Sequence, residues 1–250
     1  GLNQYQIHQK SFYSNLLFNS IISNTKHKFT TGINFAYDKY DEEVNVNFNQ
    51  DFSRIDNSVG AFFEYTFDNL NNFSFVSGAR IDQHNRLGAF VTPRLHIRYN
   101  PWKDAVIRAS VGRGKRAANI FAENQQLFAS SRNFSILNSD GKLYGLNPEI
   151  AWNYGVSFIQ KFKLLGRSSE VVFDYYVTDF QNQAVVDIDA NAQQVLFYNL
   201  TGKSFANSFQ VEFNIELIKH LNFKSAYKYF DVQTQYTTGQ LQKALQAKHR

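Results

Sequence analysis

Apolar and polar residues alternate along residues 204–217, which read SFANSFQVEFNIEL. One set of alternate positions is apolar and is broken only by Asn207; it comprises Phe205, Phe209, Val211, Phe213, Ile215 and Leu217. Successive side chains of a β-strand point to opposite faces, so this segment is predicted to be a strand with one apolar and one polar face. A helix would mix the two sets of residues.

The same period of two recurs along the chain and predicts ten strands. They cover residues 11–22, 27–37, 57–68, 73–82, 94–100, 105–111, 152–162, 171–178, 204–217 and 221–229, the first being apolar on both faces. The chain has 25 Phe and 14 Tyr but only 3 Pro, which favours paired strands because proline lacks the N–H that a ladder needs. We therefore expect an all-β, antiparallel fold.

The connections between these strands alternate between short and long. Short ones lie at 23–26, 68–72, 100–104, 164–167 and 218–220, and long ones at 38–56, 83–90, 114–148, 181–203 and 233–250. Outer-membrane barrels have short periplasmic turns and long extracellular loops. The rhythm therefore predicts an up-and-down transmembrane β-barrel wall, with many strands near the roughly 9–11 residues that cross a bilayer.

A soluble β-rich binding or adhesion module is the main alternative, because a β-sandwich also alternates. The mean hydropathy of −0.41 would suit it. The predicted strands are, however, longer than the usual mode of about 5–6 residues. A sandwich also does not require loops that are long at one end only. A passive outer-membrane porin shares every feature described so far and stays open.

Charged side chains occur on the polar face of the predicted strands. They are candidates to line a barrel lumen: Glu64, Arg80, Arg94, Arg98, Arg108, Glu212 and Lys224. Such residues could line a polar path or contact a plug, but for most of them cross-strand charge pairing is the favoured role. The acidic run Asp41, Glu42 and Glu43 falls in an expected loop and is interpreted as solvated surface.

A basic cluster lies at the root of the longest expected loop, ahead of a helix expected at 118–130. The candidate ligand-binding residues there are Arg113, Lys115, Arg116, Asn119 and Glu123. Guanidinium groups pair with phosphates, so the cluster could attract an anionic ligand or lipopolysaccharide, or be solvated loop charge. Residues 112–117 fit a G-x-G-x-x-A turn, but the preceding strand alternates, which argues against a dinucleotide site.

Other chemistry finds little support in the sequence. There is no Cys, the six His are dispersed without ligand spacing, and no nucleophile or P-loop motif occurs. We therefore expect neither an enzyme, nor a metal site, nor a cofactor. The net charge of +5 is spread along the chain, whereas nucleic-acid binders concentrate it, so no nucleic-acid partner is expected.

One stretch carries a specific resemblance. Residues 92–132 read TPRLHIRYNPWKDAVIRASVGRGKRAANIFAENQQLFASSR and are followed at 147–158 by NPEIAWNYGVSF. This resembles the TonB-dependent outer-membrane receptor family, especially receptors of Bacteroidetes-type bacteria. The matching positions are Thr92, Pro93, Arg94, Arg108, Ser110, Gly112, Gly114, Arg116, Asn119, Glu123, Pro148, Glu149, Asn153, Tyr154 and Gly155.

The resemblance implies a receptor in the bacterial outer membrane that takes up a scarce nutrient, such as an iron-siderophore, haem, cobalamin or a glycan, with energy supplied by TonB. It implies membrane lipid and lipopolysaccharide and the TonB system acting through a plug domain as partners, with a surface lipoprotein as a further candidate partner. Plugged barrels have about 22 strands. Residues 1–250 are therefore expected to be a partial barrel domain without its plug, from a protein longer at both ends.

Overall fold

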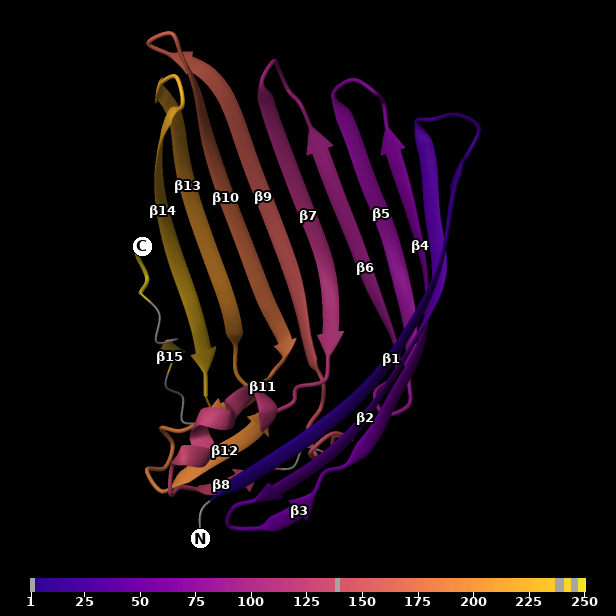
Figure 1. The fold of residues 1–250 in the computed structure, drawn as a ribbon, viewed down its shortest axis with the longest axis vertical. Coiled ribbons are helices and arrows are strands. Elements are labelled where there is room, and N and C mark those ends of the chain that lie inside the picture. The colour runs from indigo at the N-terminus through magenta and orange to yellow at the C-terminus, as the bar shows by residue number, and fades with distance from the viewer. Residues whose placement is uncertain (1–2, 138–139, 237–240, 244–246) are drawn as a thin grey trace.

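One antiparallel sheet dominates the computed structural model, which describes residues 3–137, 140–236, 241–243 and 247–250 (Figure 1). Its ten long strands are β1 (Gln4–Ile21), β2 (His27–Asn45), β4 (Arg54–Asp68), β5 (Phe73–His84), β6 (Gly88–Tyr99), β7 (Ala105–Arg116), β9 (Glu149–Leu164), β10 (Arg167–Asn182), β13 (Ser204–Ile218) and β14 (Leu221–Gln235). They follow one another across the sheet in this order, with the short β3 (Asn49–Asp51) beside β2 and β15 (Leu241–Lys243) beside β14.

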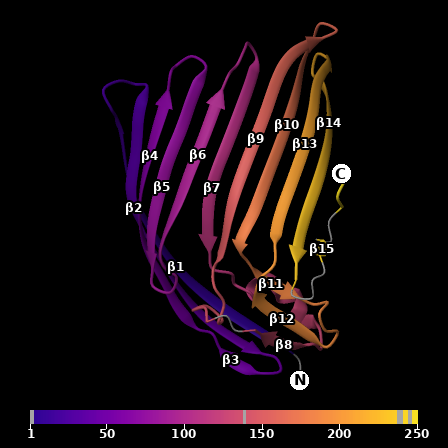
Figure 2. The same cartoon turned by 180° about the vertical axis from the view of Figure 1, so that it is seen from behind.

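The predicted fold class is confirmed. Each of the ten predicted strands corresponds to one long strand, and each neighbouring pair is antiparallel. The sheet bends into a trough whose edges, β1 and β15, do not meet within the described residues (Figures 1 and 2). None of the described residues belongs to a helix long and apolar enough to cross a membrane.

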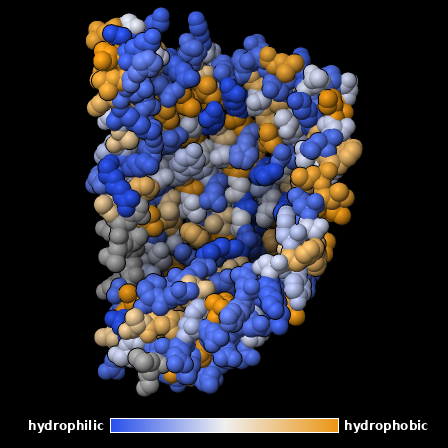
Figure 3. All heavy atoms as spheres, in the orientation of Figure 1, coloured by the Kyte–Doolittle hydropathy of each residue, from blue (hydrophilic) through white to orange (hydrophobic). Residues whose placement is uncertain are grey.

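The two faces of the sheet differ in chemistry. On the outer, convex face, one cross-strand row consists of Leu16, Ile33, Ala61, Ile81 and Val91. Its large members are well exposed, with 67% of Leu16 and 57% of Ile81 accessible. The concave face, called the inner face below, is largely hydrophilic around a recess (Figure 3). An exposed apolar band of this kind suits contact with lipid, not with water.

Glycines let long side chains cross the inner face. Gly78 stands between Glu64 and Arg94 in one row, and the Arg94 guanidinium reaches over it to pair with Glu64. A Cβ atom at Gly78 would lie 2.9 Å from the Phe63 carbonyl oxygen. Because glycine adds no side chain there, a charge pair two strands apart can close.

The short connections lie at one end of the sheet, as predicted. Several of their residues have a positive φ, including Ser23, Leu70, Asp104 and His220. The tightest is Leu165–Gly166, where both residues have a positive φ between the paired Leu164 and Arg167. This is the conformation that two-residue hairpins favour, since it matches the twist of the strands.

Two connections expected to be long are instead mostly strand. Within 38–56, β2 continues to Asn45 and β4 begins at Arg54. Within 83–90, β5 runs to His84 and β6 begins at Gly88, so the two are joined by a tight turn. In β2 the sequence hides this extension because Asp38 and Glu42 interrupt the apolar series of Tyr40 and Val44, so the alternation stops being evident before the ladder ends.

The other long connections fold into a cap at the opposite end of the sheet from the short turns (Figures 1 and 2). They contain a 3-10 helix, η1 (Ala122–Ala129), where a helix was expected at 118–130, and three short strands, β8 (Asn133–Ile136), β11 (Ala184–Asp187) and β12 (Gln194–Asn199). These strands form a second sheet in the order β11-β12-β8. Within the last expected loop, 233–250, β14 continues to Gln235 and β15 pairs with it, whereas residues 237–240 and 244–246 lie outside the described part of the chain.

We define the loop cap as residues 46–53, 117–137, 140–148 and 183–203. Its core packs against the end of β2 and consists of Val44, Ala118, Ile120, Phe121, Phe134, Leu143, Tyr144, Leu146, Val195 and Phe197. Asn47 fixes the β2–β3 tip to β8, because its side chain both accepts from the Phe134 N–H at 2.6 Å and donates to the Phe134 carbonyl at 3.1 Å. The cap is thus a packed unit, not a set of solvated loops.

The tight turn after β5 depends on a neutral histidine. His84 Nδ1 accepts hydrogen bonds from the backbone N–H groups of Arg86 at 3.1 Å and Leu87 at 3.3 Å. Burial lowers the pKa of His84 below its ordinary value of 6.5, and the cations of Arg86 and Lys115 lower it further against an opposing effect of Asp56. Protonation of Nδ1 would remove the acceptor that closes the turn.

We expect this histidine to make stability depend on pH. Its folded-state pKa is lowered, so the unfolded chain takes up the proton first, and stability is lost as pH falls below about 6.5. His84→Asn keeps a side-chain acceptor for the turn without a titrating group. Melting temperatures of the purified protein between pH 7.5 and pH 5 should therefore fall less in His84→Asn than in the parent; equal slopes would contradict the role.

Candidate functional site

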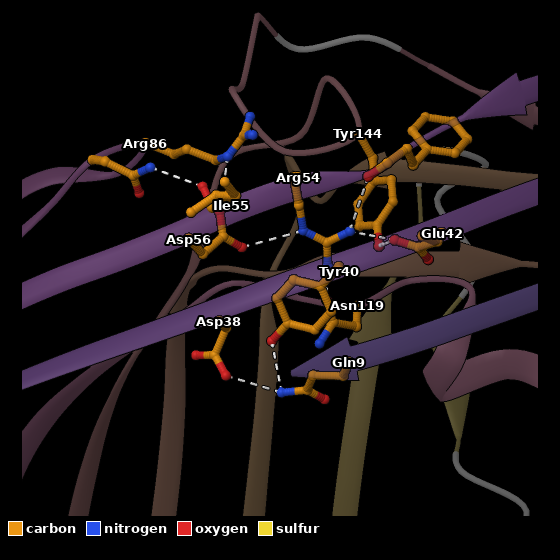
Figure 4. Close-up of polar contacts among 12 residues, drawn as sticks. Gln9, Asp38, Tyr40, Glu42, Arg54, Ile55, Asp56, Arg86, Asn119 and Tyr144 are labelled. Atoms are coloured by element: carbon orange, nitrogen blue, oxygen red, sulfur yellow. Dashed lines mark hydrogen bonds and ion pairs between the residues drawn. The ribbon is translucent and has the colours of Figure 1, made fainter. Parts of the chain in front are cut away.

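A buried arginine stands where the sheet meets the loop cap (Figure 4). The Arg54 side chain, at the start of β4, is only 3% exposed, and Glu42 on β2 beside it is fully buried. The guanidinium pairs with the Glu42 carboxylate and lies 4.1 Å above the ring centroid of Tyr40. A charge buried to this degree is stable only when it is paired and hydrogen-bonded.

The Glu42 carboxylate has further donors from both sides. Tyr5 on β1 donates to Oε1 at 2.9 Å, and Tyr144 of the loop cap donates to Oε2 at 2.6 Å. Burial and then the charge of Glu42 raise the pKa of Tyr5 and of Tyr144 above the ordinary value. Both phenols therefore stay protonated near neutral pH and keep donating to the Glu42 carboxylate.

The remaining donors of Arg54 extend the network. The Nη2 group donates to Asn119 Oδ1 at 2.6 Å, and Nε donates to Asp56 Oδ2 at 3.2 Å. The other oxygen of Asp56 lies 2.8 Å from Arg86 Nε in the β5–β6 turn. This Arg54 network joins β1, β2, β4 and the loop cap, so it fixes the cap to the wall.

A hollow of about 450 Å³ opens beside the network. We call it the cap hollow; it is bounded by Gln50–Arg54, Arg86, Ile136 and Lys142–Gly145. Its lining contains three cations, Arg54, Arg86 and Lys142, and one carboxylate, Asp51. Arg54 and Arg86 are already paired with Glu42 and Asp56, so the lining is polar and its net charge is small. With its rigid support, the hollow suits a small polar molecule better than an apolar one.

The five predicted loop residues divide into two groups. Arg116, Asn119 and Glu123 meet on the inner side: Arg116 pairs with Glu123 at 3.0 Å and with Glu149 at 2.5 Å. Glu123 also accepts from the Asn119 backbone N–H at 3.1 Å. These residues hold the start of the loop cap, and Asn119 joins it to Arg54.

Arg113 and Lys115 lie on the other face of β7. Arg113 pairs in register with Trp152 and donates to Gln181 at 3.1 Å, while Lys115 donates to the Leu87 carbonyl at 3.1 Å. Burial and then the nearby Arg113 lower the pKa of Lys115. The basic cluster of the sequence is therefore split between two faces and does not form one anion site.

The seven predicted lumen residues share the inner face. Five of them form charge pairs there: Glu64 with Arg94, Arg80 with Asp82 at 2.6 Å, and Lys224 with Glu212 at 2.7 Å. Arg98 and Arg108 face each other in register on β6 and β7. No ion pair is found for either of these two arginines among the described residues.

The centre of the site was missed by sequence reasoning. The interpretation of Asp41, Glu42 and Glu43 as solvated surface was wrong for Glu42, which is fully buried, whereas Asp41 is about half exposed. A signal was present in the alternation of Tyr40, Glu42 and Val44, whose side chains share the inner face and pack under the cap. Because Glu42 is charged, the inward-facing series Tyr40, Glu42 and Val44 does not read as apolar in the sequence.

A protein-family model matches almost the whole chain. The model of the family described as TonB dependent receptor-like, β-barrel matches residues 2–247. No curated protein matches the chain.

Solved structures with a similar fold are longer chains of low identity. The siderophore receptor PirA from Pseudomonas aeruginosa has a TM-score of 0.67 at 13% identity, over 91% of this chain and 44% of its own. A mutant of the ferric enterobactin receptor from the same organism has a TM-score of 0.66 at 13% identity, over 90% and 36%. The copper transporter OprC has a TM-score of 0.69 at 11% identity, over 95% and 40%. The chain thus spans less than half the length of these structures.

Proposed function

We propose a function from one premise: this chain belongs to the TonB dependent receptor-like, β-barrel family. In the complete protein it forms part of the barrel wall of an outer-membrane receptor. The receptor binds a scarce nutrient outside the cell and admits it with energy delivered by TonB. The wall itself catalyses no reaction.

The chemistry of the two faces supports a place in the outer membrane. The exposed apolar rows of the outer face meet lipid, and closure of the sheet by further strands satisfies its edge backbone groups. The short turns then lie in the periplasm, and the loop cap lies outside the cell. We propose that Arg113 and Lys115 meet lipopolysaccharide phosphates, which their position on the outer face at the cap end of β7 supports.

The observation that carries the proposal is the loop cap with its cap hollow. Passage of a solute through a wide pore needs no folded structure above the wall. Here three connections far apart in sequence build one core, and the Arg54 network fixes it beside a polar hollow. A rigid, preformed hollow at the entrance is what selective capture of a dilute ligand requires.

The family and the solved structures of similar fold support a proposal for the substrate class. Siderophore, ferric enterobactin and copper occur in the descriptions of the similar structures. We propose an iron-siderophore, haem, cobalamin or glycan as the nutrient. The proposed partners are the TonB system acting through a plug domain of the complete protein, and a lipoprotein at the cell surface.

Uptake by the complete receptor tests this function. We expect cells that carry the receptor gene to accumulate a radiolabelled panel member, ferric siderophore, haem, cobalamin or glycan, and to lose this ability when tonB is deleted. The energy dependence arises because a plugged barrel is closed at rest. The control is a plug-free general porin in the same two strains, through which uptake of a small sugar is unaffected by tonB.

Uptake that is unchanged without TonB would favour a passive porin over the receptor. Recovery of the receptor in the soluble fraction, without detergent, would instead favour a soluble binding module.

A further inference from the structure

Three neighbouring turns at the end of the wall opposite the loop cap combine cations with exposed apolar side chains. They are residues 100–104, 164–167 and 218–221, which join β6 to β7, β9 to β10 and β13 to β14 (Figure 1). Because β7 pairs with β9, and β10 pairs with β13, the three turns are neighbours along the rim of the sheet. We call their exposed side chains the turn patch, which consists of Trp102, Lys103, Leu165, Arg167, Lys219 and Leu221.

The apolar part of the turn patch continues the outer face of the wall. On that face, two cross-strand rows near the turns consist of Gln160, Val171, Phe213 and Ser225, and of Phe162, Ser169, Ile215 and Phe223. Leu165 lies at the tip of its hairpin and is 93% exposed. Trp102 is fixed to the outer face, because its indole Nε1 donates to Gln160 Oε1 at 2.6 Å. The lipid-facing surface therefore reaches the tips of the turns.

The position of the turns along the strands places them at the edge of a bilayer. The outward-facing residues of β9 run from Trp152, whose row also contains Arg113 and Asp179, to Leu164 beside the turn. At about 3.3 Å per residue this stretch is about 40 Å long, and a strand tilt of about 40° reduces its height to about 30 Å. A bilayer has a hydrocarbon core of about this thickness. The turn patch therefore lies at the level of the lipid headgroups.

Cations on the inner face near these turns have carboxylate partners. Lys161 lies 3.9 Å from Glu170, and Lys224 lies 2.7 Å from Glu212. The two outer rows near the turns contain no carboxylate. The carboxylates at this end of the wall thus compensate the lysines that face the interior.

The cations of the turn patch are not compensated in this way. Lys103, Arg167 and Lys219 are exposed, and no ion pair is found for any of them within the described part of the chain. Asp104 is the one carboxylate in the sequence of the three turns. The turn patch therefore combines an excess of positive charge with an apolar surface, and this combination favours contact with an anionic membrane surface.

We propose that the turn patch binds anionic phospholipid in the leaflet that surrounds the short turns. The lipid phosphate meets the cations of the patch, and the acyl chains lie along the apolar rows of the outer face. A guanidinium group can hold two phosphate oxygens at once, and the lysines add charge. A zwitterionic lipid would leave the excess charge of the patch in place. The inference rests on the proposed function only in so far as that function places the wall in a membrane.

Photocrosslinking at the tip of the β9–β10 hairpin measures which lipid lies there. In the complete receptor, Leu165 is replaced by p-benzoylphenylalanine, and the protein is reconstituted in vesicles of equal parts phosphatidylglycerol and phosphatidylcholine. We expect the peptide that contains position 165 to carry phosphatidylglycerol at least about fivefold more often than phosphatidylcholine. A preference of about fivefold corresponds to the effect of one basic residue near an anionic surface.

Removal of the cations should abolish this preference. Lys103→Gln, Arg167→Gln and Lys219→Gln combined keep polar side chains in the turns, and the ratio of the two lipids should fall to about one. Lys161→Gln with Lys224→Gln is the matched control, because these lysines lie at the same end but face inward; here the ratio should persist. In the parent, the ratio should fall when NaCl is raised to about 1 M, since salt screens the attraction.

A second reporter separates failure of the lipid site from failure of the membrane placement. Phe173 belongs to the outer face of β10, and the same crosslinker at this position should label both lipids about equally. If Phe173 labels lipid but Leu165 labels neither lipid, the turns lie in water and the lipid site is refuted. Equal labelling by Leu165 in the parent, or a preference that survives in the triple variant, would show that the cations do not select the lipid. If neither position labels lipid, the wall does not lie in a membrane, and the proposed function fails as well.

Discussion

Arg54→Ala is expected to lower the free energy of unfolding of the loop cap by about 3–5 kcal/mol, the range for breaking a buried ion pair by removing one partner. The substitution leaves the fully buried Glu42 carboxylate without its cation. It also removes the hydrogen bond that Arg54 donates to Asn119 Oδ1 and the cation that lies over the Tyr40 ring. These losses fall on one contact between the cap and the wall, so the cap should loosen while the sheet persists.

Limited proteolysis and hydrogen exchange of the complete receptor measure this effect. Cleavage within residues 117–148 should become much faster in Arg54→Ala. Lys39→Ala is the matched control, because Lys39 pairs with Asp41 on the outer side of the same strand ends and both are nearly half exposed. Such an exposed pair contributes about 0–1 kcal/mol, so the control should behave like the parent.

A double variant separates the orphaned charge from simple loss of contacts. Arg54→Met combined with Glu42→Leu replaces the pair by apolar side chains of similar volume. Because replacement of both partners removes the unpaired charge, the double variant should regain much of the lost protection. If it is as unstable as Arg54→Ala, the buried charge is not the cause; if Arg54→Ala itself is stable, the network does not hold the cap.

Leu16→Arg is expected to lower the free energy of unfolding of the receptor in the membrane by about 2–4 kcal/mol, whereas Leu17→Arg should change it little. The two leucines are adjacent on β1 and are similarly exposed, at 67% and 52%. Leu16 belongs to the apolar row of the outer face, and Leu17 pairs with Gly32 on the inner face. The same substitution thus puts a charge into lipid in one case and into a polar interior in the other.

Refolding of the complete receptor into lipid vesicles over a urea series gives the two free energies. The folded fraction can be followed by the gel shift of the unheated barrel. Equal losses for the two variants would mean that both faces of β1 meet the same medium, which would contradict a lipid-facing wall. A larger loss for Leu17→Arg would reverse the assignment of inner and outer faces.

The strands of the wall could be predicted because their signal is local. At Phe209, Val211 and Phe213, the polarity of alternate side chains is enough to identify the apolar face of the strand. The extensions of β2 and β4 could not be found in this way, because Glu42 and Arg54 are buried by each other. Their burial depends on Tyr144, which lies 102 positions from Glu42.

The candidate site was predictable only in part, for a similar reason. Arg116, Asn119 and Glu123 were placed together because they are close in sequence. The split of Arg113 and Lys115 from Arg116 follows from the strand continuing to Arg116, beyond the point where its alternation is evident. The pairing of β8 with β12 is parallel, spans four residues and joins distant segments, so no local sequence pattern predicts it.

The composition of the cap core also sets an order of assembly. Closing a contact between distant segments carries an entropic cost that neighbouring hairpins avoid. Asn3 donates to the Ser130 carbonyl 127 positions away, and Val44 packs in one core with Val195 and Phe197. Adjacent strands can pair as soon as both strands of a hairpin are available, but the core of the cap cannot form until β12 is available as well. Its formation is therefore a later and slower step than the pairing of the hairpins from β1 to β10.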